Sequence, residues 1–346
     1  MPSPTPGRQV VRFLFLRLDS AWRRLAAETQ AAHKHELGEA ILRHQGRLLL
    51  RTYSLAGTRG DTDILLWQVA DNLETLQGLQ TEILSTRLGG WLPISHSYIG
   101  ITRRSVYQLS DDPDRRDQVR IQPQDSRYLF VYPFVKTREW YALPEERRQT
   151  VMEEHIRIGH RYPGIRNNTV YSFGLDDQEF VVAFEGDEPA DFVSLVMELR
   201  ESAGAVYTLR DTPTFTCVQM SIWDMLDSLG GAPSARPESA PGGEDGFVPV
   251  ARREELSPGG SRRVYRGADA IALFDVNGRV LAVSDRCTHA RASLSEGTVD
   301  PASCVLTCPW HGGRFDLATG QPLDGPVRVA VKTWEVKVVG AWIHVR

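Results

Sequence analysis

Short apolar runs and helix-like patterns occur in the same order in both halves of residues 11–229. In the first half they cover residues 12–16, 53–55, 63–67 and 73–83. In the second half they cover residues 127–131, 171–173, 179–184 and 192–199. Apolar spacings of three and four favour a helix, and the shorter runs favour strands. Each half therefore predicts strand, helix, strand, strand, helix, strand, as in a ferredoxin-like unit. We interpret this as a duplicated α+β fold; chance similarity is the alternative.

Residues 247–346 have a different pattern, dense in short apolar runs. The candidate strands are residues 270–274, 280–283, 305–307, 327–331, 336–339 and 342–345. Asn277-Gly278 lies between two such runs and is a strong hairpin signal. We expect a small all-β domain.

A segment rich in Pro, Gly and Ser, residues 230–246, separates the two patterns. It has no apolar periodicity, so it cannot bury enough surface to order itself. A long loop within one domain is the alternative, but such loops are uncommon. We therefore expect a tail at 1–10, an α+β domain at 11–229, a linker at 230–246 and an all-β domain at 247–346.

Composition narrows the classes of partner and location. The formal net charge of -4 gives no reason to expect nucleic acid or an anionic membrane as partner. The sequence has neither a signal-peptide pattern at its start nor an apolar run long enough to span a membrane. Three of the four cysteines lie within residues 287–308, which indicates metal binding in a cytoplasmic protein rather than a disulfide framework.

Two short segments each offer one thiol and one imidazole: Cys287-Thr-His289 and Cys308-Pro-Trp-His311-Gly. A Rieske [2Fe–2S] cluster takes two cysteines on one iron and two histidines on the other. Tetrahedral zinc also accepts two Cys and two His. With Arg-Phe-Asp at 314–316 and a glycine at 320, residues 247–346 resemble Rieske ferredoxins. The resemblance implies a [2Fe–2S] cluster on Cys287, His289, Cys308 and His311.

The resemblance also indicates the type of Rieske centre. In the cytochrome bc family, two extra cysteines form a disulfide, and a Ser and a Tyr hydrogen-bond near the cluster. Ala292 and Trp310 stand here in place of those cysteines, and Gly313 and Phe315 in place of the donors. Fewer donors leave the reduced cluster less stabilised, so we expect a low-potential, ferredoxin-like centre. We expect Cys304, which has no second thiol beside it, to be a buried thiol and not a ligand.

Residues 11–229 carry a second group of characteristic segments. They read Tyr-Pro-Phe-Val-Lys at 132–136, Thr-Arg-Glu-Trp-Tyr at 137–141, Glu-His at 154–155 and Asn-Thr-Val-Tyr-Ser-Phe-Gly-Leu-Asp-Asp-Gln-Glu-Phe-Val-Val-Ala-Phe-Glu at 168–185. In these segments the chain resembles the chlorite dismutase family, in particular its peroxide-dependent coproheme decarboxylases. The resemblance implies two ferredoxin-like halves forming an α+β barrel, haem b or coproheme as cofactor, and a homopentamer.

The resemblance assigns His155 as the axial iron ligand. His155 follows a helix-like run at 143–154. His160 is the alternative, but five residues on it would lie on another helix face. Haem binds a neutral imidazole on its proximal side.

The same resemblance places Tyr132 and Lys136 against porphyrin propionates. A lysine binds carboxylates as a point charge, and a tyrosine beside a propionate can carry a radical. Arg127 and Arg138 are further candidates for propionate contacts.

A departure from chlorite dismutases proper concerns their distal arginine, which handles the chlorite oxygens. The corresponding position here is Asn167 or Asn168. An amide cannot supply a charged bidentate clamp, so we do not expect chlorite decomposition.

Two functions remain open from the sequence. One is an enzyme that uses hydrogen peroxide to convert two propionates of coproheme into vinyl groups, with loss of carbon dioxide. The other is a haem-binding peroxidase-like or electron-transfer protein in which the Rieske cluster exchanges electrons with the haem. Because no Gly-rich dinucleotide fingerprint occurs, we expect a separate reductase as electron donor.

Overall fold

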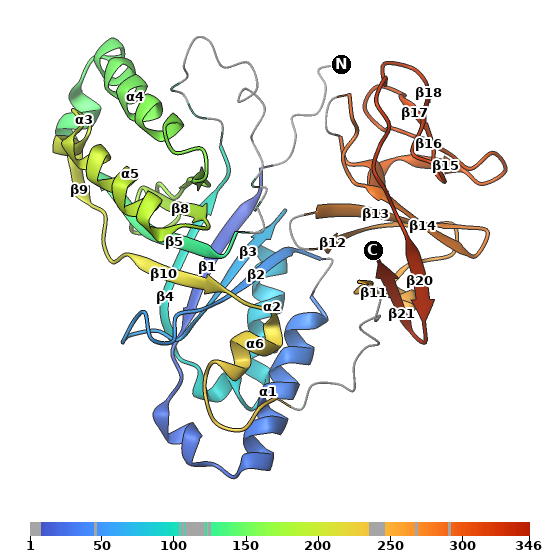
Figure 1. Cartoon of the computed structure of the whole chain (residues 1–346), viewed down its shortest axis with the longest axis horizontal. Coiled ribbons are helices and arrows are strands. Elements are labelled where there is room, and N and C mark those ends of the chain that lie inside the picture. Colours follow the sequence, from blue (N-terminus) through green and yellow to red (C-terminus); the bar gives the residue numbers. More distant parts are fainter. Residues whose placement is uncertain are drawn as a thin grey trace. The chain divides into compact units, whose positions relative to one another are not determined.

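The computed structural model describes residues 8–44, 47–103, 105, 107, 121, 123, 126–234, 246–266, 269–289 and 292–346. It contains two compact units (Figure 1). The N-terminal unit comprises residues 8–41 and 50–234, and the C-terminal unit comprises residues 246–346. Most of the predicted tail at 1–10 and linker at 230–246 lies outside the described residues, so both stay predictions.

The two halves of the N-terminal unit share the order strand, helix, strands, helix, strand, and the second half has additional short strands and helices. The first half contains β1 (Val10–Leu16), η1 (Ser20–Arg24), α1 (Ala27–Leu42), β2 (Leu49–Ser54), β3 (Ile64–Ala70), α2 (Leu73–Ser85), η2 (Gly89–Trp91) and β4 (Ile94–Ile101). The second half contains β5 (Tyr128–Lys136), α3 (Arg138–Ala142), α4 (Glu145–His160), β6 (Arg166–Asn167), β7 (Val170–Tyr171), β8 (Phe180–Gly186), α5 (Pro189–Glu201), η4 (Ala205–Tyr207), β9 (Thr208–Arg210), β10 (Phe215–Gln219) and α6 (Ile222–Asp227). The predicted duplication is confirmed.

The strands of both halves form one closed sheet. Their order is β6-β8-β7-β4-β1-β3-β2-β10-β5-β9, and an additional pairing of β8 with β5 closes the sheet into a barrel. The two halves meet where β10 pairs with β2 and where β4 pairs with β7. The expected duplicated ferredoxin-like α+β barrel is therefore confirmed.

The side chains of strand β5 alternate between the two faces of the sheet, as they do in any strand. Leu129 and Val131 are fully buried on one face. Residues on the other face pack in an apolar cluster with α4, α5 and β8; they are Tyr128, Phe130, Tyr132 and Phe134. The ring of Phe130 stacks on Phe192 of α5, with centroids 4.0 Å apart. This second face carries the residues that the sequence assigned to the porphyrin.

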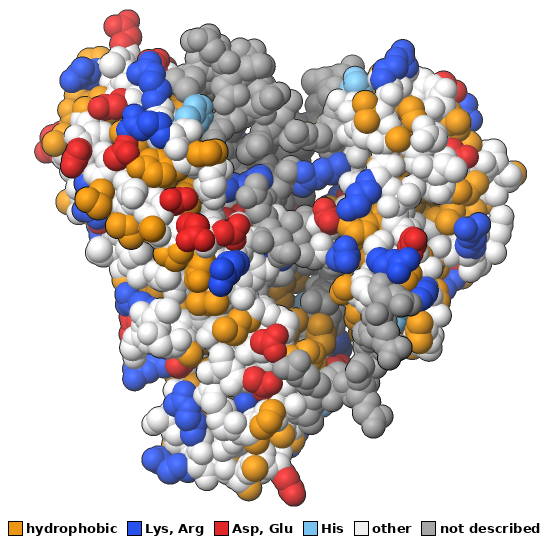
Figure 2. Space-filling model, viewed as in Figure 1, with side chains coloured by type: hydrophobic (Ala, Val, Ile, Leu, Met, Phe, Trp, Pro, Cys, Tyr) orange, Lys and Arg blue, Asp and Glu red, His pale blue; other side chains and the backbone are white. Residues whose placement is uncertain are grey.

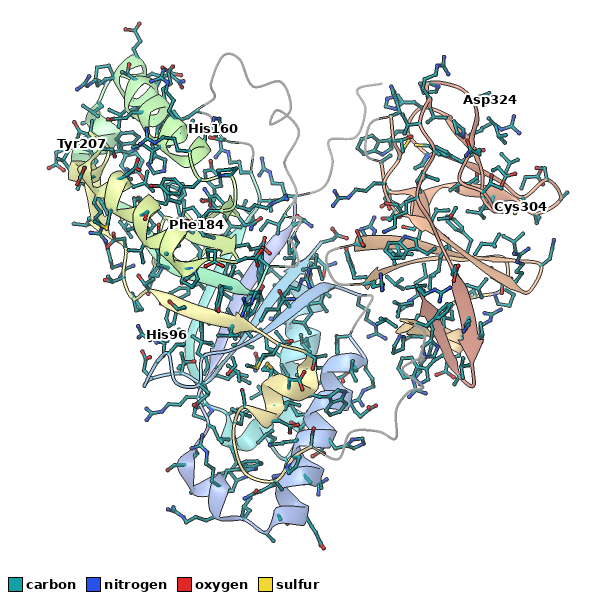
Figure 3. The ribbon with its side chains drawn as sticks, viewed as in Figure 1. His96, His160, Phe184, Tyr207, Cys304 and Asp324 are labelled. Atoms are coloured by element: carbon teal, nitrogen blue, oxygen red, sulfur yellow. The ribbon has the colours of Figure 1, made fainter. Side chains whose placement is uncertain are left out.

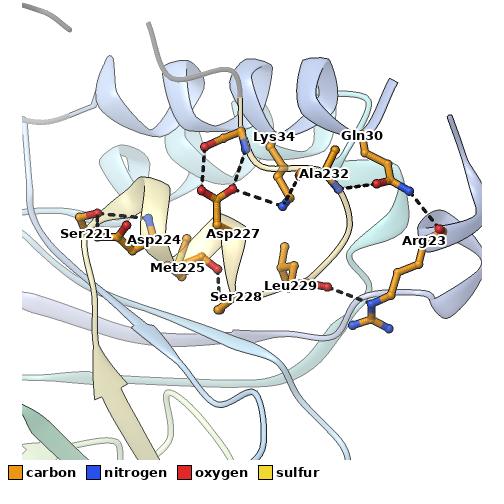
Figure 4. Close-up of polar contacts among 11 residues, drawn as sticks. Arg23, Gln30, Lys34, Ser221, Asp224, Met225, Asp227, Ser228, Leu229 and Ala232 are labelled. Carbon is orange, nitrogen blue, oxygen red and sulfur yellow. Dashed lines mark hydrogen bonds and ion pairs between the residues drawn. The ribbon is translucent and has the colours of Figure 1, made fainter. Parts of the chain in front are cut away.

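A polar network joins the segment after α6 to α1 (Figure 4). The Lys34 side chain is fully buried, and its Nζ donates to Asp227 Oδ1 at 3.3 Å and to the Ala232 carbonyl at 2.8 Å. Asp227 also accepts the Ser234 N–H at 2.6 Å, and Gln30 accepts the Ala232 N–H at 2.7 Å. These bonds hold residues 229–234 on the N-terminal unit.

The exposed surface of the N-terminal unit mixes apolar and charged side chains (Figure 2). Val193 and Met197 on α5 and Leu209 on β9 are exposed apolar residues. The homopentamer implied by the resemblance stays a prediction. None of the helices in the part of the chain that the structure describes is both long and apolar enough to cross a membrane.

The described part of the C-terminal unit is built from strands and short 3₁₀ turns. Its strands are β11 (Val248–Arg252), β12 (Ser261–Arg266), β13 (Asp269–Val276), β14 (Arg279–Ser284), β15 (Thr298–Asp300), β16 (Val305–Thr307), β17 (Arg314–Asp316), β18 (Pro322–Asp324), β19 (Thr333–Trp334), β20 (Val336–Val339) and β21 (Trp342–Val345). They form three sheets, ordered β11-β21-β20, β12-β13-β14-β19 and β15-β16-β17-β18. The all-β prediction is confirmed.

Two local predictions in this unit had opposite outcomes. The hairpin between β13 and β14 is confirmed, and Asn277 and Gly278 both have the positive φ of its turn, 54° and 84°. The strand predicted at 327–331 is wrong, because these residues form an irregular loop. Val327 and Val331 are buried there in the core beneath the ligand loops, which explains their apolar spacing without strand pairing.

Candidate cofactor sites

Helix α4 holds His155 in a half-buried position, where the charge of Lys136 on β5 reaches it. Burial and, to a smaller extent, the Lys136 ammonium lower the pKa of His155 from 6.5 to about 4, against the opposing effect of the Glu154 carboxylate. The imidazole is therefore neutral near pH 7, the form in which histidine binds iron. Glu154 also accepts the Ala203 N–H at 3.1 Å, which ties α4 to the end of α5.

His160, the rival ligand, is the exposed last residue of α4 (Figure 3). Five residues rotate a side chain by roughly 140° around a helix. His155 and His160 thus face different directions, and His155 is the more buried of the two.

Tyr132 and Lys136 lie four residues apart on β5, on the face that contacts α4 and α5. Burial raises the pKa of Tyr132 well above its usual value. Burial also lowers the pKa of Lys136 to about 8, against the opposing charge of Glu179. The Lys136 Nζ lies 4.6 Å from the centre of the Trp140 ring and donates to the Gly204 carbonyl at 3.4 Å. A partly desolvated ammonium gains from an anion such as a propionate.

Sequence reasoning missed the role of Glu179, which precedes β8. One carboxylate oxygen, Oε2, accepts the Lys136 backbone N–H at 2.8 Å and the Tyr141 hydroxyl at 2.6 Å. Burial and this hydrogen bond raise the pKa of Tyr141. Glu179 and Tyr141 lie in the segments that carry the family resemblance, but no spacing in the sequence links them.

The two arginine candidates lie at opposite ends of β5. Arg127 precedes the strand, its N–H donates to Asp187 at 2.8 Å, and it is exposed. The nine residues from Arg127 to Lys136 span roughly 30 Å of extended chain. Arg138, also exposed, begins α3 two residues after Lys136. The structure thus brings Arg138, and not Arg127, to the Lys136 end of the strand.

The register of β6 separates the two asparagine candidates. Asn168 is buried, and its Nδ2 donates to Glu185 Oε2 at 2.8 Å. Asn167 is exposed and pairs with Phe184 of β8, so the two side chains share one face. The Phe184 ring lies 6.2 Å from the ring of Tyr132. Asn167 is therefore the asparagine on the Tyr132 face of the sheet.

In the C-terminal unit, two loops present the predicted cluster ligands. Cys287 follows β14 and Cys308 follows β16, and both are buried. His289 and His311 are exposed, with ring centroids 4.9 Å apart and planes at 84°. The loops close through hydrogen bonds from the Cys287 N–H to Ala292 and from the Cys308 N–H to Gly313. The thiols thus lie toward the core and the imidazoles toward solvent.

The thiols and the imidazoles lie in different surroundings: Cys287 and Cys308 are buried in one apolar cluster, whereas His289 and His311 are exposed next to each other. A zinc site needs four such ligands around one point. A Rieske cluster needs only two protein ligands on each iron. The pairing of buried thiols and of adjacent imidazoles matches the second requirement.

Neither Gly313 nor Phe315, the two positions that carry hydroxyl donors in the cytochrome bc family, has a hydroxyl group. Phe315 is fully buried in one apolar cluster with Cys287 and Cys308. At Gly313 an added Cβ would lie 2.6 Å from Val327 Cγ1. Cys304 is half-buried against the same cluster, and burial raises the pKa of its thiol. All the cysteines lie in the described part of the chain, and no disulfide joins any of them.

Comparisons with known proteins identify the family of each unit. The chlorite dismutase family model matches residues 24–220, and the Rieske [2Fe-2S] domain model matches residues 246–335. The coproheme decarboxylase of Mycolicibacterium smegmatis is 31% identical over 229 residues, covering 62% of this chain and 97% of that protein. Ferredoxin CarAc of Metapseudomonas resinovorans is 40% identical over 100 residues, covering 29% of this chain and 92% of that protein.

Solved structures share the fold of the N-terminal unit. A mutant chlorite dismutase from Candidatus Nitrospira defluvii superimposes with a TM-score of 0.59 at 24% identity, covering 64% of this chain and 95% of that one. A heme-binding protein from Thermus thermophilus gives a TM-score of 0.57 at 23% identity, covering 66% of this chain and 99% of that one.

Proposed function

Because the chain belongs to the chlorite dismutase family and carries a C-terminal Rieske [2Fe–2S] domain, we propose that it is a haem-forming oxidoreductase that decarboxylates coproheme with hydrogen peroxide. Its similarity to curated coproheme decarboxylases supports this choice of substrate. The observation that carries the proposal is a neutral, half-buried His155 beside Lys136, with Tyr132 on the same face of β5.

The reaction balances with one peroxide for each propionate. A propionate that becomes a vinyl group loses carbon dioxide, one proton and two electrons. Hydrogen peroxide takes up those two electrons and two protons, one of them from solvent, and becomes two water molecules. The porphyrin iron, when bound, supplies the oxidising power. His155 would hold that iron, and the Lys136 ammonium would bind a propionate.

Tyr132 would connect the iron to the propionate. Its phenol is half-buried among aromatic side chains, and burial favours its neutral, protonated form. A neutral phenol can give up a hydrogen atom and then take one from the propionate chain. Asn167 on the same face offers an amide and no charge, which suits a pocket that does not need to hold chlorite.

The test is turnover of coproheme by the purified full chain with hydrogen peroxide, followed by chromatography of the porphyrins. Wild type should accumulate haem b. Tyr132→Phe should bind coproheme with a normal Soret band and stall. Tyr128→Phe is the matched control, since Tyr128 lies four residues earlier on the same face. Turnover by Tyr132→Phe at the wild-type rate would remove Tyr132 from the mechanism, and absence of turnover by wild type would refute the proposal.

The Rieske domain favours a second candidate, electron transfer between cluster and haem without decarboxylation. Its exposed pair, His289 and His311, presents the cluster side to a redox partner. Stopped-flow mixing of pre-reduced cluster with ferric haem tests this function. Haem reduction within one chain should be independent of protein concentration and lost when the chain is cut within residues 230–246. Equal rates in intact and cut protein would exclude it.

A further inference from the structure

Tyr141 is held by a carboxylate at the edge of the proposed porphyrin site. Its hydroxyl donates to Glu179 Oε2 at 2.6 Å, and the same oxygen accepts the Lys136 N–H at 2.8 Å. The Tyr141 ring also meets the exposed Phe173 edge to face, with centroids 6.2 Å apart. The phenol of α3 is thus fixed at the junction of β5 and β8.

Trp140, the residue before Tyr141 on α3, lies next to the lysine proposed to bind a propionate. Trp140 is buried, and its ring centre lies 4.6 Å from Lys136 Nζ. Trp140 also contacts Tyr207, with ring centroids 5.5 Å apart. Oxidisable side chains therefore surround Lys136 at the edge of the proposed porphyrin site.

Oxidation of a phenol requires a proton acceptor, because a phenol that loses an electron becomes a strong acid. A base within hydrogen-bond distance accepts the proton at the same time as the electron leaves the phenol. Among the described residues the Tyr132 hydroxyl makes no hydrogen bond, whereas Tyr141 already donates to Glu179. Tyr141 is thus the tyrosine of this site with a built-in acceptor.

We propose that Tyr141 is a second redox-active tyrosine of the N-terminal unit, with Glu179 as the acceptor of its phenolic proton. The proposal rests on the proposed function in one respect, that the unit binds an iron porphyrin that hydrogen peroxide oxidises. One electron passes from Tyr141 to that oxidised centre, which is reduced by one electron. The phenolic O–H bond breaks, and an O–H bond forms at Glu179 Oε2. The products are a neutral phenoxyl radical and a neutral carboxylic acid.

The chain contains a matched control in Tyr162, which follows α4. Its hydroxyl donates to Glu198 Oε1 at 2.5 Å, so the bond resembles that of Tyr141. Glu198 also pairs with the guanidinium of Arg161, and both partners lower the pKa of Glu198. A carboxylate already paired with a cation is a weaker base. Tyr162 should therefore be the poorer radical site of the two.

The experiment uses the full chain loaded with haem b and mixed with hydrogen peroxide, then freeze-quenched for EPR. Haem b is the product of the proposed reaction, so the readout does not depend on coproheme turnover. Tyr132→Phe should keep a tyrosyl radical signal, and adding Tyr141→Phe should reduce that signal several-fold. Adding Tyr162→Phe instead should leave it unchanged. Ring-deuterated tyrosine should narrow the signal, which identifies it as tyrosyl.

Glu179→Gln, also in the Tyr132→Phe background, separates proton transfer from anchoring. Its amide oxygen still accepts the Tyr141 hydroxyl, but a glutamine cannot take up the proton at neutral pH. The radical yield should therefore fall while the Soret band and circular dichroism stay those of the parent. Glu179→Asp should restore part of the yield.

Three results would overturn the inference: a signal that survives Tyr141→Phe, a signal lost equally in Tyr162→Phe, or full yield in Glu179→Gln. Absence of any tyrosyl signal would also overturn it, even if coproheme is turned over. Conversely, if a Tyr141 radical forms but coproheme is not turned over, coproheme is not the substrate, and the assignment of Tyr141 as a redox-active tyrosine still holds.

Discussion

Replacing Phe315 by tyrosine tests why the cluster is expected to have a low potential. Phe315 is fully buried on β17, in the same apolar cluster as Cys287 and Cys308. The change adds one hydroxyl donor at a position where high-potential Rieske centres carry a tyrosine. Gly313→Ser is a poorer test, since its Cβ would lie 2.6 Å from Val327 Cγ1. Such overpacking costs about 1–3 kcal/mol and would move the loop itself.

The expected shift follows from the charge of the reduced cluster. Reduction adds one negative charge, so a donor stabilises the reduced state more than the oxidised state. A hydrogen bond to a charged group contributes about 1.5–3 kcal/mol. If the difference between the two states is about 1 kcal/mol, the potential rises by about 40 mV for a one-electron couple, since about 1.4 kcal/mol corresponds to 59 mV.

The measurement is an EPR-monitored redox titration of the full chain. Phe274→Tyr is the control, because Phe274 is buried in the same core and belongs to β13, away from the ligand loops in sequence. An unpaired hydroxyl would cost either variant about 1–3 kcal/mol of stability. An upward shift in Phe315→Tyr alone supports the reasoning. An unchanged or lower potential with an intact Rieske signal, or an equal shift in both variants, would refute it.

Three further predictions concern the N-terminal unit. His155→Ala should abolish haem binding, measured by the Soret band, while the cluster EPR signal persists; haem retention in this variant with loss in His160→Ala would identify His160 as the ligand. Burial lowers the pKa of His155 from 6.5 to about 4. The free energy of unfolding should therefore include the full contribution of the neutral imidazole above pH 6.5 and lose it as the pH falls through 4. Thermal unfolding of the haem-free unit should therefore depend less on pH in His155→Ala; identical profiles would contradict this. Lys34→Met should lower the free energy of unfolding in urea by about 2 kcal/mol, which is less than the loss for a fully buried ion pair because Asp227 is partly exposed. An unchanged urea midpoint would show that the Lys34 network does not stabilise the unit.

The barrel was predictable from sequence because its pattern is local and occurs twice. Apolar periodicity within each half specifies strands and helices, and the common order specifies the ferredoxin-like topology. The strand predicted at 327–331 failed for a reason that periodicity cannot reveal. Val327 and Val331 are buried in the core from an irregular loop. The alternation of apolar residues at 327–331 therefore indicates that these side chains are buried, and not that the segment pairs with a neighbouring strand.

The candidate porphyrin site was predictable where its residues lie close in sequence. Tyr132 and Lys136 share a face because they are four residues apart on one strand. Glu179 was missed because its contacts with Lys136 and Tyr141 join the start of β8 to β5 and α3 across a sheet pairing. The choice between the two asparagines likewise needed the β6–β8 register, which sequence spacing cannot supply.

The histidines of the two units have environments suited to opposite tasks. His289 and His311 are exposed, which allows a short path for electrons between the cluster and a partner. His155 is half-buried and kept neutral by burial and by Lys136, which would suit an iron that, as proposed, reacts with peroxide away from bulk water. A single chain with both environments can separate the supply of electrons from the use of an oxidant. Electron delivery to the haem would then compete with oxidation of Tyr132 and Tyr141, so a reduced cluster should shorten the lifetime of any tyrosyl radical. The proposed radical assay, repeated with the cluster reduced beforehand, measures that competition directly.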